Sequence, residues 1–169
     1  HVRATTSYRY SWMVDNYVNP SIGHVPLRRL RADHLDDLYD QLATTGGRRG
    51  TGLAPKTVHE VHVIVRSSLD LAMRRQLVDA NVAHATNARH KRPTRKIPRA
   101  WSAEELATFL PAARPQRLYP ALHLTAYTGM RRGEVGGIKW SDLDRANQRL
   151  SISRTIQSIA GQPVEFPVK

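Results

Sequence analysis

The sequence predicts a mainly α-helical chain of two modules, joined by a basic linker and ending in a small β-hairpin. Apolar residues recur at helical spacing through much of residues 1–85 and again from about residue 101. Residues 86–100 contain two prolines and no apolar periodicity, which is typical of an extended linker. Alternating apolar residues appear only near the end of the chain. We therefore expect a helical module over 1–85, a linker over 86–99 and a second module over 100–169.

The composition favours a polyanionic partner. The 169 residues include 26 Lys and Arg but 14 Asp and Glu, so the formal net charge is +12. Such an excess suggests DNA, RNA or an acidic membrane surface as the partner. The absence of cysteine excludes disulfides and thiolate zinc sites. No apolar run approaches the ~18 residues of a membrane-spanning helix, and residues 1–20 lack the apolar segment of a signal peptide.

The linker is the most basic part of the chain. Residues 86–100 contain six basic residues and no acidic ones, which is half of the net charge. It could be a solvated tether or a strap along a phosphate backbone, and counterion release on binding phosphates favours the strap. The basic residues of the linker are Arg89, Lys91, Arg92, Arg95, Lys96 and Arg99.

Helical periodicity predicts three main helices in the first module. The first covers residues 6–18 and should stop at the turn signal Asn19-Pro20. The second covers 32–45, and the third runs from Pro55 to about residue 76. The expected core positions are Tyr10, Tyr17, Leu35, Leu38, Tyr39, Leu42, Val58, Val61, Val65, Leu69 and Ala72.

The outward face of the third helix is basic and is a candidate DNA-binding surface. It carries Lys56, His59 and Arg66. His59 and His62 are three residues apart, a spacing that a metal pair can use, but no third ligand is apparent and a boundary histidine is far commoner. The glycine-rich loop before this helix adds two further candidate DNA contacts, Arg48 and Arg49.

The second module should begin with a helix capped by Ser102 and Glu105, which have the spacing of a capping box. A second helix over 117–127 is apolar on most sides and is expected to be buried. Gly129 should end it, and a short helix should start near Arg131. An arginine on such a platform, close to free backbone N–H groups, suits an anion site.

The last part of the chain should form β-structure. We expect a turn at Asn147, a strand over 150–153, a turn at Ala160-Gly161 and a partner strand over 163–168. The sequence contains no Walker loop, no dinucleotide-binding glycine motif and no HExxH motif. The residues by themselves therefore indicate a basic two-module protein with one well-placed arginine.

Two motifs resemble the tyrosine recombinase, or phage integrase, family. The first is the run AYTGMRRGEV over residues 126–135, and the second is IKWSDLD over residues 138–144. The stretch LAPKTV over 53–58 and the entry PRAWSAEEL over 98–106 are also similar to that family. The likeness covers nearly the whole chain, but only the first half of a catalytic domain.

The resemblance implies a fold and an activity. The fold would be a SAM-like helical core-binding domain followed by the start of an α+β catalytic domain. Members of the family cut and rejoin DNA through a 3′-phosphotyrosyl intermediate, with no metal and no other cofactor. Arg131 matches the first catalytic arginine, which would clamp the scissile phosphate. Lys169 is the candidate for the lysine that gives a proton to the 5′-oxygen.

Other residues depart from the family pattern or have secondary roles in it. Arg132 is expected to contact DNA, and Glu134 to support the seat of Arg131. Gly136-Gly137 stands where a bulkier apolar residue is usual, so we expect looser packing behind Arg131. The HxxR box and the nucleophilic tyrosine of the family are missing, and the sequence begins with His1 rather than Met. We therefore expect a fragment that binds DNA without cleaving it.

The resemblance also implies partners and a location. We expect double-stranded DNA at a recombination site, a tetramer of the full-length enzyme on it, and an accessory directionality or bending factor. A bacterial or phage enzyme of this kind would act in the cytoplasm, with no membrane partner. Two alternatives stay open: a non-catalytic DNA-binding regulator that resembles an integrase front half, and an RNA-binding protein suggested by charge alone.

Overall fold

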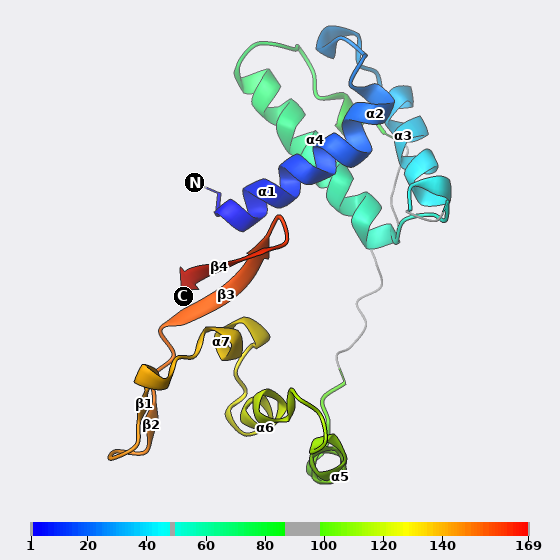
Figure 1. Cartoon of the computed structure of the whole chain (residues 1–169). Coiled ribbons are helices and arrows are strands. Elements are labelled where there is room, and N and C mark those ends of the chain that lie inside the picture. Colours follow the sequence, from blue (N-terminus) through cyan, green and yellow to red (C-terminus); the bar gives the residue numbers. More distant parts are fainter. Residues whose placement is uncertain (1, 48–49, 87–98, 169) are drawn as a thin grey trace. The chain divides into compact units, whose positions relative to one another are not determined.

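The computed structural model describes residues 2–47, 50–86 and 99–168. The chain divides into two compact units, His1–Lys96 (unit 1) and Ile97–Lys169 (unit 2). Figure 1 shows helices in both units and strands in unit 2 alone. Among the described residues, no helix is both long and apolar enough to cross a membrane.

Unit 1 is built from helices of unequal length. Its elements are α1 (Ala4–Met13), the π-helical segment η1 (Val14–Val18), α2 (Asn19–Ile22), the 3₁₀ turn η2 (Leu27–Arg29), α3 (Ala32–Thr45), α4 (Pro55–Arg74) and the 3₁₀ turn η3 (Val82–His84).

The first helix is longer than the sequence predicts. We expected a stop and a turn at Asn19-Pro20, but the chain continues without a break from α1 through η1 into α2. Pro20 is the second residue of α2, where a missing N–H is tolerated. The π-helical hydrogen bonds of η1 change the register just before the proline, so its ring does not end the helix.

The core of unit 1 lies between α3 and α4, whose predicted starts are confirmed. The four predicted core residues of α3 and all five of α4 are buried. Tyr39 is the largest, with 0% exposure, whereas Tyr10 is 44% exposed, so its predicted core position is wrong. Tyr17, Val18 and Ile22 pack against the rim of the core, which explains how the first helix is held.

A short turn ties the end of unit 1 to α4. Asn81 caps η3 and is 7% exposed. Its side-chain amide donates to the Arg66 carbonyl at 3.0 Å and to Oδ1 of Asp70 at 2.6 Å, while its own oxygen accepts from the Ala83 N–H at 2.9 Å. The predicted helical turn at Asn81 is therefore present.

Unit 2 combines short helices with two hairpins. Its elements are α5 (Ala103–Ala113), α6 (Tyr119–Thr128), α7 (Arg132–Gly137), the 3₁₀ turn η4 (Trp140–Asp142), β1 (Leu143–Asp144), β2 (Arg149–Leu150), β3 (Arg154–Ile159) and β4 (Gln162–Pro167).

The start of unit 2 follows the predicted capping. Oγ of Ser102 accepts from the Glu105 N–H at 3.2 Å, and the Glu105 carboxylate accepts from the Ser102 N–H at 2.9 Å. These two bonds satisfy N–H groups that the first turn of α5 leaves without helical partners. Gly129 ends α6 in the left-handed region, at φ +67°, a conformation that favours glycine.

The prediction that the helix over 117–127 is buried is wrong for this chain. No residue of α6 is buried, and Leu122 and Tyr127 are 37% and 73% exposed. The apolar composition of α6 indicates a surface that packing would cover. Among the described residues, too few elements surround α6 to cover it.

Both hairpins are antiparallel. The turn predicted at Ala160-Gly161 and its partner strand over 163–168 are confirmed by the β3–β4 turn and by β4, whereas the strand predicted over 150–153 is displaced. β1 pairs with β2 around the predicted turn at Asn147, and β3 pairs with β4 from Arg154↔Pro167 to Ile159↔Gln162. Residues 151–153, predicted as a strand, instead connect the two hairpins. The Ser151 N–H donates to the Asp142 carbonyl at 2.9 Å and continues the β1–β2 pairing, whereas the Ser153 carbonyl accepts from the Val168 N–H and continues the β3–β4 pairing. Alternation alone could not show that the chain passes from one hairpin to the other between these two residues.

Candidate nucleic-acid interface and its central arginine

Arg131 lies at the start of α7, as the sequence predicts. It is the N-cap residue, in extended conformation, and follows Met130, which is 4% exposed. The side chain of Arg131 is 86% exposed, while that of Glu134 is 15% exposed. A buried residue on one side and a paired acid on the other thus fix the backbone of Arg131 and leave its guanidinium in solvent.

Glu134 holds Arg131 at two points. Its Oε2 accepts from the Arg131 backbone N–H at 2.9 Å, and its Oε1 accepts from Nη1 of the guanidinium at 2.9 Å. These two bonds hold the pKa of the Glu134 carboxyl below its usual value, and the bond from the Arg131 backbone N–H contributes more than the bond from its guanidinium. Glu134 is therefore ionised at neutral pH, and its geometry fits the predicted supporting role.

The expected buried platform beneath Arg131 is absent in this chain, because α6 has no buried residue. What supports α7 is the hairpin. A Cβ on Gly133 would lie 2.7 Å from the Ile156 carbonyl oxygen, and one on Gly137 would lie 3.0 Å from the Arg154 carbonyl oxygen. The helix thus lies directly against the backbone of β3. The expectation that Gly136-Gly137 loosens packing is wrong for Gly137, since the missing side chain allows this close approach.

An ion-pair network at the end of α7 was not predicted. Nη1 of Arg154 donates to Oδ2 of Asp142 at 2.7 Å and to the Gly137 carbonyl at 3.4 Å. Its Nε lies 3.5 Å from Oε1 of Glu165, and Nζ of Lys139 lies 3.2 Å from Oε2 of the same carboxylate. We name Arg154, Asp142, Glu165 and Lys139 the hairpin-base network. Its members come from η4, β3, β4 and the residue before η4, so no local spacing could reveal it.

Of two further predicted site residues, Arg132 and Lys169, only Arg132 is among the described residues. Arg132 is the first residue of α7 and is exposed, as a DNA contact requires. Lys169 lies outside the described residues. The residue before it, Val168, donates its N–H to the Ser153 carbonyl at 3.1 Å, so the described part of the hairpin is paired up to that point.

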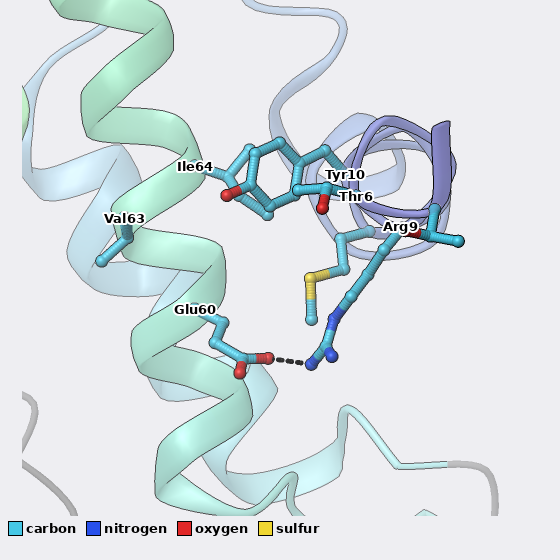
Figure 2. A pocket seen from close by; sticks show the side chains of 8 residues that line it. Thr6, Arg9, Tyr10, Glu60, Val63 and Ile64 are labelled. Atoms are coloured by element: carbon cyan, nitrogen blue, oxygen red, sulfur yellow. Dashed lines mark hydrogen bonds and ion pairs between the residues drawn. The ribbon is translucent and has the colours of Figure 1, made fainter. Parts of the chain in front are cut away.

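The outward face of α4 keeps two of its predicted basic residues accessible. Lys56 and Arg66 are exposed, and His59 is half-buried. Glu60 of α4 is paired with Arg9 of α1, across a groove of about 420 Å³ that Figure 2 shows from close by. Among the described residues, no acidic side chain forms an ion pair with Lys56 or Arg66.

The second acid on the outer side of α4 is also occupied. Oδ1 of Asp70 accepts from the Asn81 amide and lies 3.3 Å from Nε2 of His84. The hydrogen bond from Asn81, with a smaller contribution from His84, keeps the pKa of the Asp70 carboxyl below its usual value. Asp70 thus stays ionised and also interacts electrostatically with Arg66, so it offsets part of the positive charge of that arginine.

The histidine pair of α4 has an alternative explanation to metal binding. Nδ1 of His62 lies 3.2 Å from the Tyr39 hydroxyl, and the rings of His59 and His62 are 6.3 Å apart. Over the described part of the chain, no three His, Asp or Glu residues are grouped as a metal site requires. His62 thus contributes to the polar edge of the core.

The remaining predicted DNA contacts cannot be placed together. Arg99 is described, and its guanidinium forms an ion pair with Glu105 at the start of α5. The others lie outside the described residues: Arg48, Arg49, Arg89, Lys91, Arg92, Arg95 and Lys96.

Known proteins provide an independent comparison. No protein-family model matches the chain. The ICEBs1 integrase of Bacillus subtilis (strain 168) is 25% identical over 114 residues, which is 66% of this chain and 30% of that protein. The Tn1549 transposon integrase, solved in complex with circular intermediate DNA, superposes with a TM-score of 0.75 at 14% identity, over 99% of this chain and 54% of that one.

A second integrase structure agrees with the first. A lambda integrase dimer bound to a COC′ core site superposes with a TM-score of 0.65 at 18% identity, over 99% of this chain and 44% of that one. The chain thus spans less than a third of the curated relative and about half of these solved chains. The resemblance predicted from the sequence is confirmed: the chain has the fold of the core-binding domain and the first part of the catalytic domain of a tyrosine-recombinase integrase.

Proposed function

We propose that this chain is the DNA-clasping front half of a tyrosine recombinase that integrates or excises DNA at a specific site. Residues 1–85 would be the core-binding domain, 86–99 a strap on the phosphate backbone, and 100–169 the beginning of the catalytic domain. The observation that carries the proposal is the placement of Arg131, exposed at the start of α7 with its backbone fixed by Glu134, in a fold shared with integrases solved on DNA.

The chemistry follows from the arginine. A guanidinium can donate two parallel hydrogen bonds to the nonbridging oxygens of a phosphodiester. In strand cleavage, negative charge increases on those oxygens in the pentavalent transition state, so Arg131 would stabilise that state more than the ground state. Lys169 would give a proton to the departing 5′-oxygen. The attacking tyrosine is not assigned to any residue of this chain, so we expect the chain alone to bind DNA without cutting it.

Partners and setting follow from the same proposal. The complete enzyme would act as a tetramer on two recombination sites in the bacterial cytoplasm, with an accessory bending or directionality factor. A lambda integrase tetramer has been solved on a Holliday junction, which supports this assembly by analogy. Lys56, His59, Arg66 and Arg132 would contact DNA together with the basic residues of the linker and of the glycine-rich loop.

The test is the salt dependence of DNA binding by the chain. Affinity for a 20-base-pair duplex, measured by fluorescence anisotropy, should fall ~10³-fold or more between ~50 and ~200 mM salt if at least six phosphates are contacted. The double variant Lys56→Gln/Arg66→Gln should lower the salt slope by about two. The matched control is Arg145→Gln/Arg149→Gln, which removes two exposed charges from the β1–β2 hairpin.

Two results would overturn the proposal. An affinity that stays flat across the salt range would exclude an electrostatic clasp on DNA. Tighter binding to an RNA duplex of the same length would favour the RNA-binding alternative, because shape and 2′-hydroxyl contacts let proteins distinguish the two.

A further inference from the structure

We infer that Arg154 is a positioning residue that locks α7, and with it Arg131, to the base of the β3–β4 hairpin. The inference rests on the proposed function, because it assigns Arg154 a role in presenting Arg131 to a phosphate. It goes beyond that function by naming the side chain that joins the two parts of the site. Arg154 itself is not a catalytic residue, since its guanidinium is turned toward protein groups.

The contacts of Arg154 reach three other parts of unit 2. Its guanidinium donates to Asp142 in η4 and to the Gly137 carbonyl at the end of α7, and it lies beside Glu165 in β4. Its side chain is 20% exposed and that of Asp142 is 10% exposed. An arginine with several hydrogen-bond partners and little solvent is held in one geometry, unlike an exposed ion pair.

The position of Arg154 in the hairpin lets its contacts connect α7 to the open end of β3 and β4. Arg154 is paired with Pro167 in the β3–β4 register, so it lies at the open end of the hairpin, next to Val168. Arg131 is the N-cap of the six-residue helix α7, whose last residue, Gly137, accepts a hydrogen bond from Arg154. The Arg154 guanidinium thus joins the helix that Arg131 caps to the end of the strand that precedes Lys169.

Asp142 connects Arg154 to the segment that follows α7. Its Oδ2 accepts both from Arg154 and from the Lys139 backbone N–H, at 2.7 and 2.8 Å. Lys139 in turn reaches Glu165, which lies beside Arg154. The segment after α7 is therefore held by its backbone and its side chain to the same network. Without Arg154, the close contact of Gly133 and Gly137 with β3 would be the main remaining connection between helix and hairpin.

The experiment uses the full 169-residue chain labelled for NMR, as wild type, Arg154→Met, Arg154→Lys and the control Arg149→Met. Arg149 is an exposed arginine in β2 that forms no ion pair with the described residues. Two quantities are measured: amide hydrogen exchange, and the Arg131 Nε–Hε signal during titration with a 20-base-pair duplex. The same titration gives the overall dissociation constant.

We expect Arg154→Met to act locally. Protection of the Ile138 and Val168 amides should fall at least tenfold, while that of the Gln157↔Val164 pair at mid-hairpin changes less than threefold. The DNA-induced shift of the Arg131 signal should fall to less than half of the wild-type shift. The overall dissociation constant should stay within about threefold, because the contacts of unit 1 and the linker remain. Arg154→Lys should recover part of both effects through Asp142, and Arg149→Met should match wild type.

The outcomes separate the two proposals. Failure of the wild-type chain to bind DNA would overturn the proposed function. Normal DNA binding with unchanged Ile138 and Val168 exchange in Arg154→Met would overturn the lock alone. Uniform loss of protection across unit 2, or an Arg131 shift equal to wild type despite the loosened hairpin, would show that Arg154 acts only on stability and would also overturn it.

Discussion

The two units of the chain differ in how well they bury their own apolar side chains. Unit 1 encloses Tyr39, Leu35 and Val61 with no measurable exposure, between helices that the sequence predicts closely. In unit 2 the described buried side chains are Leu110, Ala113 and Met130, and α6 has none. The comparison teaches that unit 1 is stabilised mainly by its core, whereas unit 2 depends on capping, close backbone contact and ion pairs around α7.

The largest expected effect concerns the basic linker predicted over residues 86–99. Replacing its six basic residues, Arg89, Lys91, Arg92, Arg95, Lys96 and Arg99, with Gln should lower the salt slope of DNA binding by about five. The loss should be similar on specific and nonspecific duplexes, because phosphate contacts do not read sequence. Anisotropy titrations on both duplexes measure it. A loss confined to a specific site would instead mean that this segment reads bases.

The next effect would separate Arg131 from Arg132. In a strand-cleavage assay on a complete enzyme that contains this sequence together with an HxxR box and a nucleophilic tyrosine, Arg131→Ala should lower the single-turnover rate by ~10²–10³, as for the loss of an oxyanion donor. Arg132→Ala should have a much smaller effect, since Arg132 is the first helical residue of α7 and lacks the two bonds with which Glu134 holds Arg131. DNA affinity should change little in both variants. The opposite ranking of the two rates would show that the assigned register of the site is wrong.

A pair of leucine substitutions would test the difference in burial directly. Leu35→Ala should destabilise unit 1 by about 2–5 kcal/mol, because it leaves a cavity in a closed core. Leu122→Ala in α6 should have an effect below about 1 kcal/mol, since this side chain is already 37% exposed. Urea unfolding followed by probes in each unit measures both. Equal losses at the two positions would mean that α6 is covered in solution.

The smallest expected effect is a pH dependence of α7. The pKa of the Glu134 carboxyl is lowered in the folded chain, so its contribution to stability is present above the ordinary pKa of a glutamate, ~4.3, and is lost as the pH falls through the lowered value. The Val135 amide, bonded to the Arg131 carbonyl at 3.0 Å, should lose protection over that window. In Glu134→Gln, which keeps an acceptor but no charge, the protection factor of the Val135 amide, taken relative to the intrinsic exchange rate at each pH, should stay constant over that window.

Where sequence reasoning succeeded, the signal was local. The core of α3 and α4 follows from one apolar stripe on each helix, and the Ser102 cap and the Gly129 stop follow from single residues whose chemistry fits one position. The position of Arg131 at the start of α7 could be predicted because a family motif surrounds it. In each case, residues within a few positions of one another determine the structure.

Where it failed, the cause was not local. The apolar composition of α6 shows that the helix suits burial but cannot show what covers it. Arg154 and Asp142 are 12 residues apart on different elements. The chain has 26 basic residues, and the sequence around Arg154 does not show which acidic residue it pairs with. The stop predicted at Asn19-Pro20 failed because the π-helical segment changed the hydrogen-bond register that the proline rule assumes.

That π-helical segment, η1, acts as a one-residue phase shift in the first helix. Met13 before it is buried beside Ile64 of α4, and Tyr17, Val18 and Ile22 in and beyond it pack against the core between α3 and α4. An uninterrupted α-helix would rotate one set of residues by about 100° relative to the other. Deleting a single residue between positions 14 and 18 would thus preserve helicity while turning either Met13 or the packing residues outward. In this part of the chain, the number of residues is as strict a requirement as their identity.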